Sequence, residues 1–387
     1  MNTTAAHPVP LLTRPFALAW VAYFFHALSF QLHLHVPGYL HARGASEFDI
    51  GLIYAVSAAF AIVVKPFFGR RIDAVGPRPV LLVGGVLATM STCGYMLAQG
   101  HGLRWIYPLR MLQTIAIQVL VTSFYAYAAH HLPERRRIQG IGLFGVAGIL
   151  PIGLAGLLGE VLLRLRPDYT LLFATSTGLA MLAWAISATL TAAAPVGDGP
   201  PRRFSAAIWQ RELLPLWFAS LLCAIIAAIY FTFLKTFVQT TGIGSVAIFF
   251  SMYTTMSIIV RVLGGGLPER MGPKRVLFMG MAWMAVGLFL LGQASSGYGI
   301  AAAGIACGLG QGYGLPVLLG LVVARADPRA RGSALAIFTS FYDIGTIVAG
   351  PLFGLVVRTT NYAVMFRMAA VLMLIGIGLF ARLDRRH

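Results

Sequence analysis

Twelve long apolar runs, separated by short polar connections, account for most of this sequence. A helix needs about 20 mostly apolar residues to cross a bilayer, and each run approaches or exceeds that length. The runs cover residues 16–39, 49–69, 79–98, 105–130, 138–163, 169–193, 213–238, 245–267, 274–293, 298–324, 332–357 and 361–381. The pattern predicts an all-α membrane protein with twelve transmembrane helices.

One connection is longer and more polar than the others. Residues 194–212 are rich in Pro, Gly and Arg, and they separate six apolar runs from six. We therefore expect an N-terminal six-helix bundle over residues 1–193, a cytoplasmic linker over 194–212 and a C-terminal six-helix bundle over 213–387.

The connection after the second run recurs after the eighth. Residues 65–78 and 261–274 share a cation, glycines, an acid, a proline and a second cation at an offset of 196. The matching residues are Gly69, Asp73, Gly76 and Arg78 in the first copy and Gly265, Glu269, Gly272 and Lys274 in the second. We expect the glycines to end a helix and turn the chain. The acids are expected to lie at a helix N-terminus or to pair with an arginine.

A second pair of loops supports the repeat. Residues 133–137 and 328–332 carry similar Pro- and Arg-rich sequences at an offset of 195. The two matches together indicate two related halves in the same orientation, joined as pseudo-symmetric bundles.

Composition excludes a soluble protein. Hydrophobic residues make up 58% of the chain and charged residues 11%, with a mean hydropathy of +0.80, whereas soluble domains carry about 25% charged residues. The net charge of +17 does not indicate nucleic-acid binding, because the charges flank the apolar runs and form no stripe.

The basic residues also predict the orientation, since Lys and Arg accumulate on the cytoplasmic side. Of 29 Lys and Arg, only eight fall on the outer side when both termini are cytoplasmic. Those eight are Arg43, Arg104, Arg110, Arg164, Arg166, Lys235, Arg358 and Arg367. We expect a multi-pass protein of the bacterial inner membrane with cytoplasmic N- and C-termini, its first run retained as a helix.

Motifs for enzymatic or cofactor chemistry are not found in the sequence. Cys93, Cys223 and Cys307 lie inside apolar runs without CxxC spacing, so they read as small core residues. There is no GxxxxGK[ST] loop for nucleotide phosphates, no HExxH and no GxSxG. The sequence therefore predicts no enzyme, no cofactor and no metal site, and it disfavours direct coupling to ATP.

Asp343 is the one acid expected deep inside an apolar run. It lies about eleven residues into its run, or ~16 Å deep at about 1.5 Å per residue. Ionisable groups in the hydrocarbon core are costly and therefore indicate function. Asp343 is predicted to be the main proton-coupling acid, with Arg110 as the nearest type of partner. The alternative is a structural acid bonded to Tyr or Ser hydroxyls.

Polar residues in the first run share one helix face. His26, Ser29 and His33 are spaced i, i+3 and i+7. They are predicted to line a cavity and bind substrate, with His26 as a second candidate for proton coupling. The alternative is histidines satisfied between helices. A metal site built on His33, His35 and His41 is not favoured.

Further substrate-binding candidates lie on the fourth and tenth runs. Arg110 and Gln113 form a polar side of the fourth run, and Arg110 is suited to an anionic substrate. The alternative is an arginine that extends to the outer interface. Gln311 stands among closely spaced glycines, which also indicate tight helix packing.

At the repeated loops the chain resembles the major facilitator superfamily over nearly its whole length. The resemblance rests on Gly69, Asp73, Gly76 and Arg78, on their copies in the second half, and on Arg110 and Gln113 as an Arg-x-x-Gln motif. The end of the second run at Lys65 and the Asp343-Ile-Gly345 run look like the sugar- and drug-efflux (arabinose-efflux-like) branch. The resemblance implies a rocker-switch carrier with a central cavity, in which the repeated loops act as a gating motif.

The expected function is therefore secondary active transport. We expect a monomeric carrier in the lipid bilayer that exports a small organic molecule in exchange for protons. Proton-coupled uptake of a metabolite and a non-transporting receptor with the same fold stay open as alternatives. A polar or anionic substrate and an amphiphilic drug both fit the residues.

Overall fold

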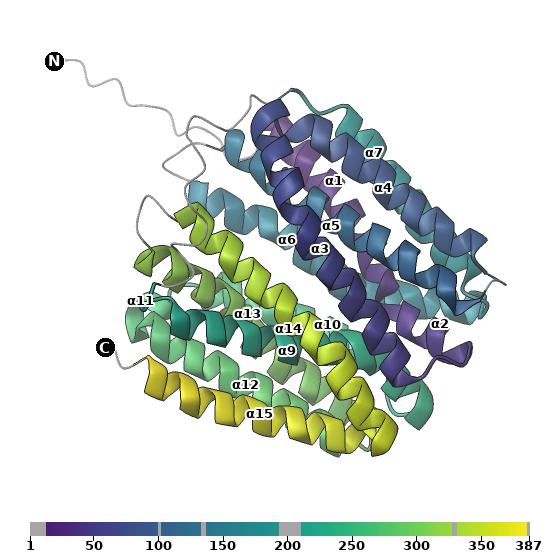
Figure 1. The fold of residues 1–387 in the computed structure, drawn as a ribbon, viewed down its shortest axis with the longest axis vertical. Coiled ribbons are helices and arrows are strands. Elements are labelled where there is room, and N and C mark those ends of the chain that lie inside the picture. Colours follow the sequence, from purple (N-terminus) through teal and green to yellow (C-terminus); the bar gives the residue numbers. More distant parts are fainter. Residues whose placement is uncertain (1–12, 100–101, 133–136, 193–209, 327–330, 385–387) are drawn as a thin grey trace.

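The computed structural model describes residues 13–99, 102–132, 137–192, 210–326 and 331–384, and these ranges are helical with no strand (Figure 1). Twelve of the helical segments are long and apolar enough to cross a membrane. The predicted all-α fold is thus confirmed. The predicted linker, 194–212, lies mostly outside the described residues, so the domain boundaries stay a prediction.

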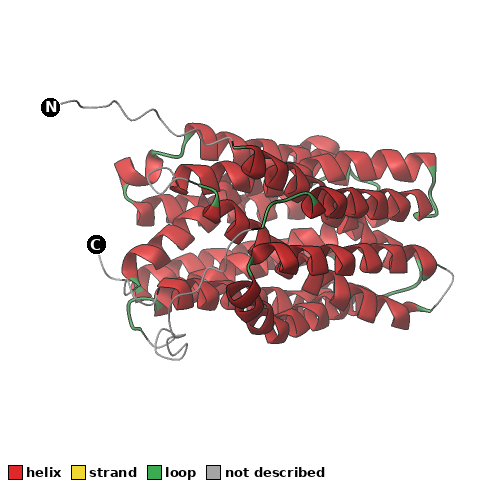
Figure 2. Ribbon diagram, turned by 90° about the horizontal axis from the view of Figure 1, so that it is seen from above, coloured by secondary structure: helices red, strands yellow, loops and turns green. Residues whose placement is uncertain are grey.

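The helices of the first half alternate in direction across the molecule. They are α1 (Arg14–Gln31), η1 (Leu32–His35), α2 (Val36–Ala42), α3 (Glu47–Val75), α4 (Pro77–Leu97), η2 (Leu103–Trp105), α5 (Ile106–His130), α6 (Arg137–Leu165) and α7 (Thr170–Ala188). The second half contains α9 (Leu214–Thr241), α10 (Val246–Leu263), α11 (Leu267–Met271), α12 (Pro273–Gln293), α13 (Gly297–Arg325), α14 (Arg331–Thr359) and α15 (Tyr362–Leu383). Figure 2 shows the long helices running roughly along one direction.

An even number of crossings brings the start of α1 and the end of α15 to the same side. We call this side the terminal side and the opposite one the far side. The helices α3, α5, α7, α10, α13 and α15 begin on the far side, and the other long helices begin on the terminal side.

The helix ends follow from local sequence. Ser46 and Asp49 form a reciprocal capping box at the start of α3, and Ser245 caps α10 through the backbone N–H of Ile248. Gly76 and Gly272 have φ of +82° and +89°, and each separates two helices.

The prediction that every repeated glycine ends a helix is wrong for Gly69. That residue lies inside α3, which continues to Val75. In the second half the helix does stop early, because α10 ends at Leu263 and Gly265 follows in the turn before α11. Glycine permits a helix end without enforcing one.

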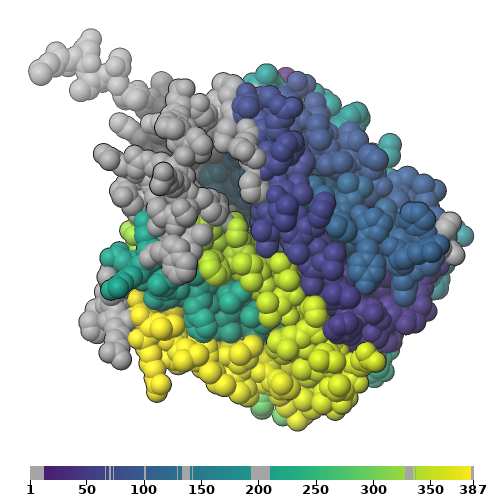
Figure 3. Space-filling view, viewed as in Figure 1, coloured from purple at the N-terminus to yellow at the C-terminus, as the bar shows by residue number. Residues whose placement is uncertain are grey.

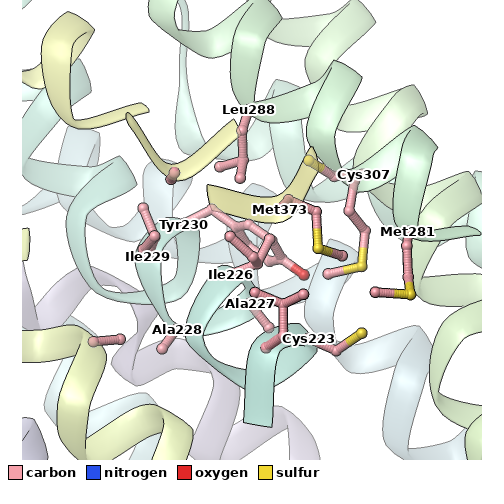
Figure 4. Close-up of a cluster of buried hydrophobic side chains, with 14 of the residues drawn as sticks. Cys223, Ile226, Ala227, Ala228, Ile229, Tyr230, Met281, Leu288, Cys307 and Met373 are labelled. Carbon is pink, nitrogen blue, oxygen red and sulfur yellow. The ribbon is translucent and has the colours of Figure 1, made fainter. Parts of the chain in front are cut away.

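Each half has its own apolar core. The core of the second half gathers around α9, where Tyr230 is surrounded by Cys223, Cys307, Met281 and Met373 (Figure 4). Cys223 and Cys307 are buried and Cys93 is partly buried, all as free thiols, as predicted for small core residues.

The internal repeat is visible in equivalent contacts. The guanidinium of Arg78 donates a hydrogen bond to the carbonyl of Ala188, 2.9 Å away, and so joins the start of α4 to the end of α7. Lys274 donates to the carbonyl of Asp384 and joins the start of α12 to the end of α15. The two cations are 196 residues apart in the sequence, and so are the two residues whose carbonyl groups accept. The repeated cations thus clamp helices within their own half.

The two halves touch most closely toward the far side. There α3 crosses α14 so tightly that a Cβ on Gly51 or Gly350 would overlap the backbone of the other, and Gly354 packs in the same way on Glu47. Figure 3 shows the surfaces of α3 and α14 in contact. On the other flank, α6 approaches α10 through Gly156 and Ala247. Small residues allow such close approach of membrane helices.

Gly350→Ala is expected to weaken far-side closure, since the new methyl group needs space that the backbone of Gly51 occupies. The distance between spin labels at Ala42→Cys and Thr360→Cys, two exposed far-side positions, should lengthen by several ångström in a protein without its native cysteines. Gly378→Ala is the control, because nothing lies within 4 Å of that site. Unchanged label distances in Gly350→Ala would show that the contact does not limit closure.

Candidate functional site

A charged pair links the two halves. The Nζ of Lys65, on α3, donates to the carboxylate of Asp343, on α14, and the Nε2 of Gln118, on α5, lies 3.4 Å from the other carboxylate oxygen. The side chains of Lys65 and Asp343 are 22% and 14% exposed. This cluster, which we call the inter-bundle ion pair, therefore holds one acid of the second half against two polar groups of the first.

The identity of this partner corrects the sequence-based expectation. Asp343 pairs with Lys65 and Gln118, and neither Arg110 nor a Tyr or Ser hydroxyl contacts its carboxylate in the described chain. Lys65 closes an apolar span that starts at Glu47, and Asp343 lies inside the apolar span Ile337–Thr359. A charge at this depth needs such a partner.

The histidine face of α1 points into the first half. The hydroxyl of Ser29 donates to the carbonyl of Ser176 on α7, 2.7 Å away. His33 is buried, with its Nδ1 3.2 Å from the carbonyl of Ser29 and its ring against Tyr95 and Phe173. These contacts pack Ser29 and His33 inside the first half, while the Nε2 of His33 is buried without a hydrogen-bond partner in the described chain. Substrate binding by both residues stays a prediction.

Like His33 on η1, whose Nε2 is buried without a hydrogen-bond partner among the described residues, His26 on α1 has an unpaired ring nitrogen. Its ring is buried against Phe124, and its Nε2 has no hydrogen-bond partner in the described chain. A buried imidazole with a free nitrogen is able to accept or donate a proton, but it lies on a different helix from the inter-bundle ion pair. Its role in proton coupling stays a prediction.

Arg110 and Gln113 bind each other. The Nη1 of Arg110 donates to Gln113 Oε1 at 2.7 Å, and the guanidinium carbon lies 4.1 Å from the ring centre of Tyr54. No carboxylate lies within ion-pair distance of Arg110 in the part of the chain that the structure describes. Arg110 is buried, which argues against extension to the membrane surface.

Gln311 lies within the second half. Its Nε2 donates to the hydroxyl of Tyr342 on α14 at 3.3 Å, while its Oε1 is buried without a partner among the described residues. Gln311 therefore contacts Tyr342, the residue next to Asp343 in the sequence. Substrate binding by Arg110, Gln113 and Gln311 stays a prediction.

Two acids that join the halves on the far side were not among the sequence-predicted site residues. The carboxylate of Glu47 accepts hydrogen bonds from Tyr362 at 2.6 Å and Thr236 at 3.1 Å, and lies 3.2 Å from Nδ1 of His41. Glu160, on α6, accepts from the backbone N–H of Ala247 at 2.9 Å. Its carboxylate thus binds the N-terminus of α10, where the helix dipole favours negative charge. In the sequence, the available signal for these contacts was the position of each acid near the far-side end of an apolar run.

The predicted gating motif is only partly described. The side chain of Asp73 lies outside the described part of the chain, and Glu269 is exposed on α11. Arg78 and Lys274 form the clamps within each half described above. Control of switching by this motif stays a prediction.

A cavity of about 1120 Å³ opens between the halves toward the terminal side. It lies between α6 of the first half and α10, α11 and α13 of the second. Arg261, Glu269 and Tyr313 contribute polar groups to a mainly apolar lining. Among the described residues, no three His, Cys, Asp or Glu side chains come together in a way that could hold a metal ion.

Comparison with known proteins agrees with this architecture. The sequence profile of the Major Facilitator Superfamily matches residues 19–270 and 216–387. An uncharacterized MFS-type transporter, YhhS of Salmonella enteritidis PT4, is 26% identical over 375 residues, covering 91% of this chain and 87% of the relative. YhhS of Escherichia coli K12 is 25% identical over 370 residues, with coverage of 91% and 87%.

Solved structures share the fold at low sequence identity. The nucleoside transporter NupG has a TM-score of 0.78 at 14% identity, covering 97% of this chain and 100% of its own. A POT family transporter in complex with a thioalcohol-conjugated peptide has a TM-score of 0.81 at 11% identity, with 96% of each chain covered. The human organic anion transporter MFSD10 has 0.71 at 16%, with coverage of 95% and 99%.

Lys65→Met is expected to lower the apparent free energy of unfolding by roughly 1–3 kcal/mol, because it leaves Asp343 charged and unpaired between the halves. Lys65→Met combined with Asp343→Leu should recover most of the loss, since no charge is then left behind. Thermal unfolding of the purified protein in detergent measures both. Additive losses in the double variant would contradict the pairing. Arg261→Met, at the equivalent position of the second half, is the control. It should lower the apparent free energy of unfolding by less than Lys65→Met does.

Glu47→Ala is expected to shift the protein toward a state that is open on the far side, since Tyr362 and Thr236 lose the acceptor that ties them to the first half. The label pair at Ala42→Cys and Thr360→Cys should report a longer distance. Glu47→Gln keeps one acceptor oxygen and should give a smaller shift. Equal, unshifted distances in both variants would mean that Glu47 does not hold the far side closed.

Proposed function

The chain belongs to the Major Facilitator Superfamily and is a multi-pass membrane transporter, and from this premise we propose that it is a secondary carrier that exports a small organic molecule in exchange for protons. The proposal includes a monomer in the bacterial inner membrane, with the terminal side in the cytoplasm, and membership of the sugar- and drug-efflux branch. The observation that carries it is the inter-bundle ion pair of Lys65 and Asp343.

The contacts support alternating access. The halves meet through Glu47, Glu160 and the glycine contacts on the far side, and they enclose the cavity of about 1120 Å³ on the terminal side. Carriers built from repeats expose a site between the halves to one side at a time. In this conformation substrate enters from the cytoplasm.

Asp343 supplies the coupling step. As a carboxylate it attracts Lys65 and joins α14 to α3. When it gains a proton the attraction ends, and Lys65 is left without a counter-ion in an apolar region. Protonation therefore changes the relative stability of the two conformations, which is the requirement for coupling proton movement to switching. Gln118 is able to hydrogen-bond the carboxyl group in both protonation states.

Two further parts of the proposal are the direction of transport and the substrate class. The names of the fold neighbours cover nucleosides, a peptide and organic anions, so the fold is compatible with several substrate classes. Uptake of a substrate together with protons uses the same ion pair, with the substrate moving in the opposite direction. A receptor that does not transport needs no such coupling group. Transport assays with an imposed pH gradient separate these possibilities.

Asp343→Asn is expected to abolish accumulation driven by a pH gradient while leaving exchange measurable, because the amide cannot carry a proton through the cycle. Counterflow of a panel of labelled organic acids, sugars, nucleosides and amphiphilic drugs in proteoliposomes, with and without the gradient, identifies a substrate and measures both activities. Asp343→Glu should retain part of the coupling. Asp168→Asn, an exposed acid on the far side, is the control. Accumulation by Asp343→Asn equal to that of the parent would make the acid structural.

A further inference from the structure

The inter-bundle ion pair has no counterpart in the other half of the repeat. Lys65 corresponds to Arg261 at the offset of 196, so the second half keeps the cation. The position equivalent to Asp343 falls at Ala147 with this offset, or at Gly148 with the offset of 195. The repeat thus places a cation opposite residues that have no charge.

The amide of the cluster is also missing. Gln118 corresponds to Gly314, beside Tyr313 on α13. Replacement of a carboxylate and an amide by Ala or Gly removes volume as well as polar partners. The consequence is visible in the cavities: the space beside Lys65 and Gln118 measures about 20 Å³, whereas the equivalent space beside Arg261 measures about 1120 Å³.

Arg261 has no acidic partner in the described chain. No carboxylate lies within ion-pair distance of it, and Glu269, which lines the same cavity, is exposed and does not pair with it. The Nε of Arg261 is buried without a hydrogen-bond partner. Tyr125 and Tyr253 are titratable neighbours of Arg261 among the described residues.

The tyrosines come from both halves. Tyr125 lies on α5 with its ring 5.8 Å from that of Tyr23, and Tyr253 lies on α10 below Arg261. A Cβ on Gly148 would meet the hydroxyl of Tyr23 at 2.7 Å, so a tyrosine hydroxyl borders the position that corresponds to Asp343 in the second half. Hydroxyls are able to donate to an anion but do not neutralise Arg261.

Apart from Arg261, Glu269 and Tyr313, the lining of the cavity is apolar. Leu143, Val146 and Ile149 face the cavity from α6, and Ile258, Pro316 and Val317 from α10 and α13. Its volume exceeds the roughly 300–1,000 Å³ typical of small-molecule sites. An arginine fork in the wall of a mainly apolar cavity matches a molecule with one carboxylate or phosphate on an apolar body.

We propose that the cavity beside Arg261 binds the anionic group of an amphiphilic organic anion, which takes the place that the carboxylate of Asp343 has beside Lys65. This assignment rests on the proposed function and names the substrate class for it. A bound anion satisfies the guanidinium and bridges the halves on the flank where the described residues supply no ion pair. The same chemistry fits a lipid phosphate that enters between α6 and α10.

The test compares three probes with one apolar body in the purified, detergent-solubilised full chain: 4-phenylbutyrate, its neutral amide 4-phenylbutyramide and the cation 4-phenylbutylamine. Apparent Kd values come from ligand-dependent thermal shifts. The parent should prefer the carboxylate over the amide by at least about ten-fold, the effect of one charged hydrogen bond. Arg261→Gln should lose that preference, and Arg261→Glu should prefer the amine.

Arg358→Gln, at an exposed position outside the cavity, is the matched control and should bind like the parent. Monodisperse elution of each variant from a sizing column establishes that it is folded. Equal affinity of the parent for carboxylate and amide, or carboxylate binding by Arg261→Gln as tight as that of the parent, would overturn the assignment.

Two lipid conditions identify the source of the anion. If a free organic anion is the ligand, 4-phenylbutyrate binds equally well in nanodiscs of phosphatidylcholine and in nanodiscs that contain phosphatidylglycerol. If the phosphate of a net anionic lipid is the ligand, phosphatidylglycerol weakens binding of the probe in the parent and has no effect in Arg261→Gln. Binding needs no gradient, so failure here is distinct from failure of proton coupling at Asp343.

Discussion

The structure depends on the cost of placing charge between apolar helices. Lys65 and Asp343 come from different halves, and each would be expensive in a lipid environment without the other. Their attraction therefore fixes where α3 and α14 meet, and this in turn requires the glycines at positions 51, 350 and 354, which let the backbones approach. The contact between α3 and α14 combines this ion pair with the small residues that permit close approach.

The repeat gives the two halves similar frames but different interfaces. The clamps of Arg78 and Lys274 keep each half rigid in the same way. On one flank of the molecule α3 and α14 are joined by charge, whereas on the other flank α6 and α10 separate around a cavity that contains Arg261. A carrier with equivalent ion pairs on both flanks would be tied shut on the terminal side. Loss of the second carboxylate leaves an opening and an unneutralised cation in the same place.

The sequence predicted the fold well because membrane spans depend on local composition. Apolar runs of sufficient length sufficed for the twelve helices, and the repeated loop for the relation between halves. The partner of Asp343 was not predictable in the same way, since Lys65 lies 278 residues away. Lys65 was visible only as the end of a span, and Glu47 as one acid at a helix start. Which distant groups meet depends on how the halves pack, and periodicity contains no information about that.

The same contacts explain how a tightly packed interface remains able to switch. On the far side the halves are held by glycine contacts and by a few hydrogen bonds, to Glu47, to Glu160 and between Gln239 and Tyr169. A hydrogen bond contributes only about 0.5–1.5 kcal/mol net, so such a set is comparable to the few kcal/mol that separate two accessible conformations. A change of one charge at Asp343 is of the same order. The interface is therefore weak enough, relative to the rigid clamps within each half, for protonation and ligand binding to decide which side is open.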